Sequence, residues 1–262
     1  MADTRSIFSN DHPFKIIFMA VSVCLVASVL VSAAAIGLRP YKAANERLAK
    51  QANVLQVAGL DAEPDEIGAV FERRIEPRVV DLRSGRFTDV IDPAGYDERL
   101  AERDPALSEA VPADADIAQI KRRPNFATVY LVRSESAVET VILPVHGYGL
   151  WSTLYGFVAL KPDGNEIVGL QFYDHAETPG LGGEVDNPNW RALWAGKSLF
   201  DDAGDVAIEV VKSGAAGPHQ VDGIAGATLT ARGVSNLVRY WVGQDGFGPF
   251  LDNLEEELAD NG

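Results

Sequence analysis

Three glycine-containing segments hold the residues whose types and spacing suit ligand chemistry. The first is Asp222-Gly-Ile-Ala-Gly-Ala-Thr228, which runs directly into the apolar-patterned stretch 229–242. That stretch predicts an amphipathic helix, and Thr228 or Thr230 stands where a helix N-cap belongs. The simpler interpretation is a glycine turn followed by a capped helix. The functional interpretation uses the same geometry, because free N–H groups and the dipole at a helix start stabilise an anion such as a phosphate.

The second and third segments have the composition of a site for a flat ligand. His175-Ala-Glu-Thr-Pro-Gly-Leu-Gly-Gly183 follows a strand-like run and packs a carboxylate, a hydroxyl and three glycines into one loop. Glycine lets the backbone approach a ligand closely, although a plain connecting loop explains the same residues. In His146-Gly-Tyr-Gly-Leu-Trp-Ser-Thr-Leu-Tyr-Gly156, the indole of Trp151 could cover a planar ligand, whereas Tyr155 suits a core position.

Other chemistries are not indicated. The sequence has no dinucleotide-binding, phosphate-loop or serine-hydrolase motif, and its four histidines are scattered. A single cysteine, Cys24, excludes an internal disulfide and a cysteine-based metal site held by this chain alone, so we expect no metal. Cys24 lies in an apolar run, where filling a helix surface is its expected role.

The charge disfavours nucleic acid as a partner. The formal net charge is −15, of which residues 1–39 contribute +1 and the remainder −16. A surface this acidic repels phosphate backbones.

Residues 16–38 form an uncharged apolar run that predicts a transmembrane helix. At about 1.5 Å per residue it reaches roughly 34 Å, enough for a hydrocarbon core of about 30 Å. A cleaved signal peptide is the alternative, but the run is longer than a usual signal core and Arg39 to Lys42 follow it as interface anchors. Flanking charge points the C-terminal part weakly toward the cytoplasm, and long domains can translocate regardless.

The remaining pattern predicts an α+β fold. Residues 43–60 have helical spacing with Gly59 as a stop, and residues 61–124 predict irregular, peripheral structure. Strand-like runs begin at Ala127, with a hairpin turn at 161–165, and two helices close the chain. The predicted strands are 127–132, 138–143, 156–160, 166–173 and 206–211, and the predicted helices are 229–242 and 249–259.

Taken together, the three segments resemble the FMN-binding domain family, and most closely its branch of C subunits of sodium-translocating NADH:quinone reductases. The resemblance rests on Gly149-Leu-Trp-Ser152, Glu177-Thr-Pro-Gly-Leu-Gly-Gly183 and Gly226-Ala-Thr228, together with the apolar helix. It implies domains at 1–15 (cytoplasmic N-terminus), 16–38 (transmembrane helix), 39–124 (linker helix and peripheral segment) and 125–262 (FMN-binding domain with a mostly antiparallel twisted sheet).

The resemblance also implies the cofactor and its site. FMN would be joined through its phosphate to Thr228 by a flavin transferase that cleaves FAD, with Asp222 as the upstream acidic residue of the motif. This sequence has Ala225 where the family pattern has Ser or Thr. The other expected cofactor contacts are Gly226, Ala227, Leu229 and Thr230 around the acceptor, Glu177, Thr178, Gly180, Leu181 and Gly182 in the second segment, and Leu150, Trp151, Ser152 and Thr153 in the third.

Finally, the resemblance implies a one-electron relay in a six-subunit complex of the bacterial inner membrane. That complex passes electrons from NADH to ubiquinone and moves sodium outward, and the C-terminal domain of this chain would be periplasmic, against the charge bias. Two alternatives stay open: the G subunit of the ferredoxin-dependent Rnf electron-transport complex, and a non-redox membrane-tethered ligand-binding protein.

Overall fold

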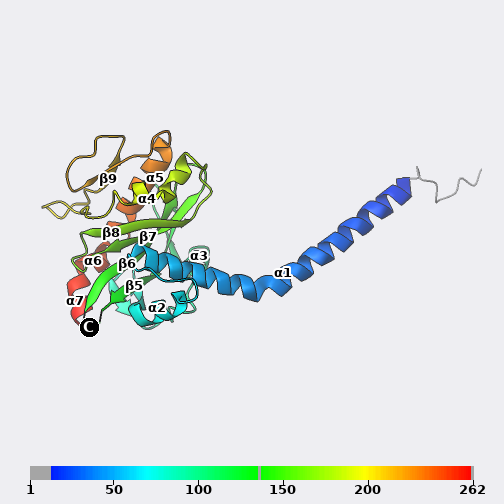
Figure 1. Cartoon of the computed structure of the whole chain (residues 1–262), viewed down its shortest axis with the longest axis horizontal. Helices are drawn as coiled ribbons and strands as arrows, with labels where there is room; N and C mark the ends of the chain where they lie inside the picture. Colours follow the sequence, from blue (N-terminus) through cyan, green and yellow to red (C-terminus); the bar gives the residue numbers. More distant parts are fainter. Residues whose placement is uncertain (1–12, 135–136, 261–262) are drawn as a thin grey trace, which may run out of the picture. The chain divides into compact units, whose positions relative to one another are not determined.

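The computed structural model describes residues 13–134 and 137–260 (Figure 1). It falls into two compact units, one ending at Ala49 and the other beginning at Lys50. Of the expected N-terminal segment, residues 1–12 lie outside the described residues.

The apolar run lies in α1 (Pro13–Val57), one helix that continues through Pro40. It contains an 18-residue window with a mean hydropathy of 2.7 and no buried residue, so its length and composition suit a membrane span. The expected separate helix at 43–60 is therefore the end of this longer helix. Gly59 stops it as expected: with a φ of +72° it donates to the Gln56 carbonyl, while Leu60 N–H donates to the Leu55 carbonyl.

The unit from Lys50 onward is built on a six-stranded sheet in the order β2-β1-β5-β6-β7-β8, with every neighbouring pair antiparallel. This confirms the predicted α+β class. The strands are β1 (Ile75–Asp81), β2 (Arg86–Thr88), β5 (Phe126–Arg133), β6 (Val138–Tyr148), β7 (Thr153–Leu160) and β8 (Ile167–Asp174).

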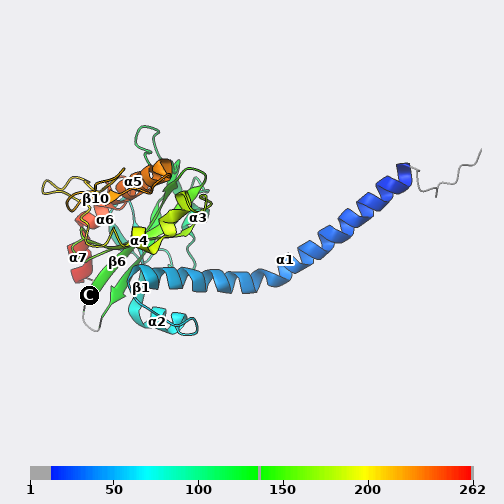
Figure 2. The ribbon, with the colours of Figure 1, turned by 45° about the horizontal axis from the view of Figure 1, so that its top comes forward.

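Each face of the sheet has its own apolar core. On one face, the larger cluster receives Leu237 and Trp241 from α5 (Thr228–Val242), Phe250 from α6 (Gly248–Asp252) and Leu254 from α7 (Leu254–Asp260). On the other face, Val54 to Val57 at the end of α1 and α2 (Ile67–Arg74) cover a smaller cluster. Figure 1 and Figure 2 show α5 and α2 on opposite sides of the sheet.

Short elements complete the described structure. They are α3 (Glu98–Ala101), β3 (Ser108–Ala110), β4 (Arg122–Pro124), the 3-10 helix η1 (Gly182–Asp186), α4 (Pro188–Arg191), β9 (Glu209–Val211) and β10 (Gln220–Asp222). β9 and β10 pair in parallel and lead the chain to the start of α5.

The structure differs from the sequence prediction in the segment 61–124, where charged residues interrupt a strand, and near the C-terminus. The segment 61–124, expected to be irregular, contributes β1 and β2 to the main sheet. Within β1 only Ile75, Val79 and Val80 are buried, and the half-buried Glu76, Pro77 and Arg78 between them interrupt the apolar pattern. The predicted helix 249–259 is two helices that part at Asn253. The strand predicted at 206–211 is reduced to Glu209–Val211.

The other strands and the hairpin turn are confirmed. β6 is longer than predicted and continues to Tyr148. Gly164 has a φ of +69° in the turn, and Lys161 N–H donates to the Glu166 carbonyl across it.

Candidate functional site

Helix α5 begins immediately after a tight turn formed by residues 224–227. Ala227 N–H donates to the Ile224 carbonyl at 3.1 Å, and Gly226 takes a φ of +79°, the left-handed value that a type II turn needs at its third position. Ala227 holds the N-cap position and no side chain caps the helix, so the expected threonine cap is wrong. Thr228 is instead the first helical residue, with an exposed hydroxyl, and the helix start remains available to an anion.

The carboxylate of Glu177 joins three segments that are far apart in the sequence. Its Oε1 accepts the N–H groups of Leu150, Trp151 and Ser152 at 3.0, 2.9 and 3.3 Å. Its Oε2 accepts the hydroxyl of Thr230 at 2.6 Å, and Glu177 is only 5% exposed. Burial alone would raise the pKa of this carboxyl, but the hydrogen bonds from Thr230 and the three N–H groups outweigh burial and hold the pKa below its usual value. Glu177 is therefore a charged clasp between the loop at 150–152 and the first turn of α5.

His175 supports this clasp from behind. Its Nδ1 accepts the N–H of Glu177 at 3.2 Å, and its Nε2 lies 2.9 Å from Asp186 Oδ2, so the neutral ring protonated at Nε2 satisfies both contacts. Ser152 adds a second link, because its hydroxyl accepts the N–H of Ala176 at 2.7 Å. The loops at 150–152 and 175–177 are thus fixed to each other by backbone as well as side-chain groups.

Large apolar side chains on these loops and on the first turn of α5 are exposed to solvent. Trp151 is 66% exposed and Leu229 is 52% exposed, and Leu150 and Leu181 are exposed as well. A Cβ placed on Gly226 would lie 3.1 Å from Leu181 Cδ2, which shows how closely the second segment approaches the turn before Thr228. Exposed apolar groups gathered on fixed loops are typical of a surface that a ligand or partner covers.

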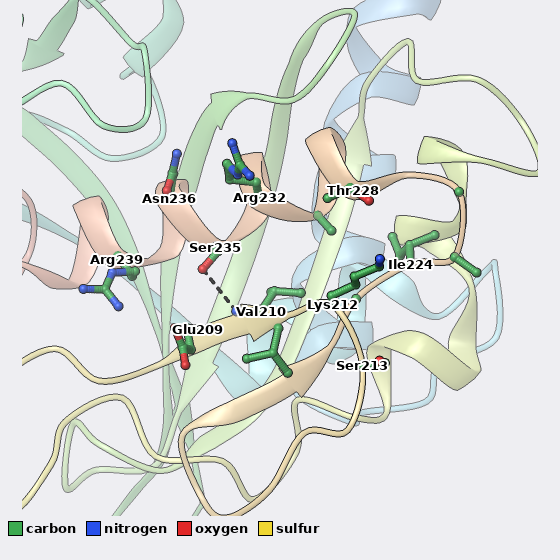
Figure 3. Close-up of a pocket in the computed structure, with 15 residues that line it drawn as sticks. Glu209, Val210, Lys212, Ser213, Ile224, Thr228, Arg232, Ser235, Asn236 and Arg239 are labelled. Carbon is green, nitrogen blue, oxygen red and sulfur yellow. Dashed lines mark hydrogen bonds between the residues drawn. The ribbon is translucent and has the colours of Figure 1, made fainter.

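A cavity of about 710 Å³ lies on the other flank of Thr228, between α5 and β9 (Figure 3). Lys212, Arg232 and Arg239 bring positive charge to its wall, and Glu209 brings the one carboxylate. Its remaining lining is Val210, Val211, Ser213, Gly223, Ile224, Ala225, Gly226, Thr228, Ala231, Ser235 and Asn236.

A buried imidazole–carboxyl pair lies where β6 leads into the 149–152 loop. His146 Nε2 is 3.2 Å from Glu102 Oε1, and within the described residues neither atom has another hydrogen-bond partner. His146 stacks on Tyr155, and its carbonyl accepts the indole N–H of Trp241. Burial lowers the pKa of His146 to about 3, and burial, reinforced by Glu98, raises the pKa of Glu102 to about 7. In mildly acidic solution the proton of this pair therefore resides on Glu102 and no ion pair forms.

Comparisons with known proteins place this site in a family. The FMN-binding domain family matches residues 149–243. The C subunit of the Na(+)-translocating NADH-quinone reductase of Pseudomonas aeruginosa is 54% identical over 96% of this chain and 99% of its own length. This chain belongs to the family of that C subunit. The family expected from the sequence is thereby confirmed.

Other members agree. The corresponding C subunit of Yersinia pestis is 48% identical over 97% of both chains. The crystal structure of Shewanella oneidensis NqrC superposes with a TM-score of 0.77 at 38% identity, covering 81% of this chain and 99% of that one. The crystal structure of the C subunit from Parabacteroides distasonis gives a TM-score of 0.66 at 26% identity, covering 82% of this chain and 96% of that one.

The matched region contains all the site residues expected from the sequence, and the structure brings most of them together. Thr230 and the loop Leu150 to Ser152 meet at Glu177, and Thr228 and Leu229 lie in the same first turn of α5 as Thr230. Thr153 opens β7 opposite Tyr148. Thr178 turns its carbonyl to the N–H groups of Leu181 and Gly183. Gly180 has a φ of +75°, and a Cβ on Gly182 would lie 2.5 Å from Glu177 Oε2.

Asp222 forms hydrogen bonds with the β9–β10 loop and with Trp190. Its carboxylate accepts the N–H of Ala215 at 2.8 Å, and its carbonyl accepts the indole N–H of Trp190. Asp222 thus holds the loop between β9 and β10, which begins with Lys212, and the turn before Thr228 follows directly after β10.

Four residues at this site were not predicted from the sequence: His175 and Asp186 behind Glu177, and Lys212 and Arg232 in the cavity wall. Arg232 had a usable signal, since it lies four residues after Thr228 and hence about one helical turn along. Among the described residues, no group of three or more His, Cys, Asp or Glu side chains could hold a metal ion.

Proposed function

We propose that this chain carries FMN as a phosphoester on Thr228 and relays electrons within a sodium-translocating NADH–quinone reductase. The observation that carries the proposal is the exposed hydroxyl of Thr228 at an uncapped helix start, beside the exposed apolar side chains of Trp151 and Leu181. Phosphate suits the helix start, and a planar tricyclic ring suits the apolar surface.

Attachment needs little from the acceptor. The Thr228 oxygen forms a bond to the flavin-side phosphorus of FAD, the phosphoanhydride bond breaks, AMP leaves and the hydroxyl proton is released. A flavin transferase supplies this catalysis, so Thr228 acts as the anchor and has no later acid–base role. Once bound, the flavin supplies the electron chemistry, and the protein supplies position and electrostatics.

The clasp at Glu177 explains how the protein holds such a ring. Because its carboxylate is fully engaged by protein groups, Glu177 fixes the loops, and direct contact with the ring falls to Trp151, Leu181 and Leu229. Thr178 and Gly180, which are exposed on the same loop, border that surface.

The chain would work alongside the other members of a six-subunit complex, anchored by residues 16–38, with its folded unit in the periplasm. The relatives compared, at 45–54% identity, are all named as the C subunit of the Na(+)-translocating enzyme, which favours this assignment over the ferredoxin-dependent Rnf complex. Protease treatment of intact spheroplasts tests the orientation, since a periplasmic unit is digested and a cytoplasmic one is protected.

Attachment is tested by producing the full chain together with a flavin transferase. Denaturing gels viewed under ultraviolet light should show fluorescence in the wild type and in Thr228→Ser, and none in Thr228→Ala. Ser213→Ala is the matched control, because it removes another exposed hydroxyl from the same cavity and should leave the fluorescence unchanged. Fluorescence that persists in Thr228→Ala contradicts the proposal.

A further inference from the structure

The cavity beside Thr228 has two ends, which differ in whether their charged side chains have hydrogen-bond partners within the protein. At the far end, Arg239 donates to the Ile208 carbonyl, Ser235 accepts the N–H of Val210, and Glu209 accepts from Gln220. At the near end, Lys212 and Arg232 make no hydrogen bond or ion pair with any described residue. Both are exposed and both line the cavity next to Thr228.

These two cations stand out against the charge of the chain. The protein has a net charge of −15 and 38 acidic side chains, yet the cavity wall includes a single carboxylate, Glu209. That carboxylate lies on β9 with its oxygen held by Gln220. Positive charge at the near end is therefore not neutralised by the protein itself.

The near end has the layout of a phosphate site. Lys212 approaches from the segment after β9, and Arg232 lies one turn along α5 from Thr228 (Figure 3). The first turn of α5, which no side chain caps, adds backbone N–H groups at the same end of the cavity. Two cations and a helix start around one acceptor hydroxyl suit a group with charged, hydrogen-bonding oxygens.

We infer that Lys212 and Arg232 form a phosphate clamp, which binds the non-bridging oxygens of the phosphate ester at Thr228 and holds the incoming flavin nucleotide there before attachment. This inference rests on the proposed function and adds the residues that recognise the phosphate. It also divides the cofactor between two flanks of Thr228. The phosphate faces the cavity, and the ring lies against Trp151 and Leu181.

The test follows the rate of flavin attachment to the full chain in detergent, with a flavin transferase and FAD supplied. We expect the double variant Lys212→Gln/Arg232→Gln to be modified about tenfold more slowly, because two charge-assisted contacts to phosphate are lost. Arg239→Gln is the matched control: it removes a cation from the same cavity that already has a protein partner, and its rate should stay within about twofold of wild type. The conservative double variant Lys212→Arg/Arg232→Lys should recover the rate.

A second measurement does not depend on the transferase. In fully modified protein, loss of two positive charges beside the cofactor should shift the flavin midpoint potential to more negative values, and Arg239→Gln should shift it less. A double variant that matches wild type in both rate and potential overturns the clamp. A wild type that takes up no flavin overturns the proposed function itself, so the two failures are distinguishable. Both substituted side chains are exposed, and the single variants give the same test if the double variant folds poorly.

Discussion

Replacement of Glu177 by Gln should loosen the site without changing its shape. The carboxylate accepts four hydrogen bonds while 5% exposed, and glutamine keeps one acceptor oxygen but loses the charge. Charge-assisted hydrogen bonds are worth roughly 1.5–3 kcal/mol and neutral ones roughly 0.5–1.5 kcal/mol. Since the four bonds share one group and do not add fully, we expect a loss of about 2 kcal/mol. For a unit of this size that corresponds to about 4–8 °C in Tm.

Thermal unfolding of the full chain, followed by tryptophan fluorescence, measures this loss. The direction in which this stabilisation changes with pH also follows from the pKa of Glu177. Because the pKa of Glu177 is lowered in the folded state, its contribution is present above the ordinary glutamate pKa and is lost as pH falls through the lower folded value. The difference between wild type and Glu177→Gln should therefore be full at pH 7 and shrink below about pH 4. Equal Tm values at pH 7 would refute the assignment of Glu177 as a charged clasp.

Two further predictions concern neighbouring features. In wild type, the His146–Glu102 pair binds one proton between about pH 4.5 and 6.5 in both states. The proton is on Glu102 in the folded protein and on His146 in the unfolded chain. Because the number of bound protons is the same, the pair does not make the unfolding free energy depend on pH in this range. Glu102→Gln removes the proton that the folded state binds. The unfolding free energy of this variant, relative to wild type, should therefore fall by about 2–3 kcal/mol as pH drops through that window. Urea denaturation at several pH values measures this, and an equal pH dependence in the two proteins would contradict it. Gly226→Ala should lower the unfolding free energy by about 1–2 kcal/mol and slow flavin attachment. An L-residue is strained at a φ of +79°, and the new Cβ would press on Leu181. An unchanged Tm together with an unchanged rate of modification would exclude a role for the left-handed turn.

The sequence could predict the site residues better than their roles. Glycine spacing and residue type, which are local signals, picked out the three segments that hold Glu177, Trp151 and Thr228. The family resemblance then singled out these residues within them. The direction of a side chain is not local. Glu177 faces inward only because Thr230, 53 residues later, and the loop at 150–152 supply four donors. Lys212 and Arg232 were missed for the same reason, since their place in the lining of one cavity depends on how β9 packs beside α5.

The fold shows the same division. Strands with continuous apolar runs, such as β5 and β7, were predictable from composition. β1 was not, because Glu76, Pro77 and Arg78 interrupt its apolar residues while its pairing with β5 holds it in the sheet. The sequence also predicted two segments, 16–38 and 43–60, where the structure has the single helix α1, which continues through Pro40.

Because three distant segments meet at one carboxylate, the proposed attachment site exists only in the folded chain. A chain in which β6 and β7 have not paired, or in which α5 has not docked, cannot gather the donors that Glu177 needs. The hydroxyl of Thr228, the proposed acceptor, then lies in an unstructured glycine-rich segment. Maturation of this protein would therefore follow a fixed order, with folding first and the flavin second, and the enzyme that attaches the flavin would act on folded molecules and pass over misfolded ones.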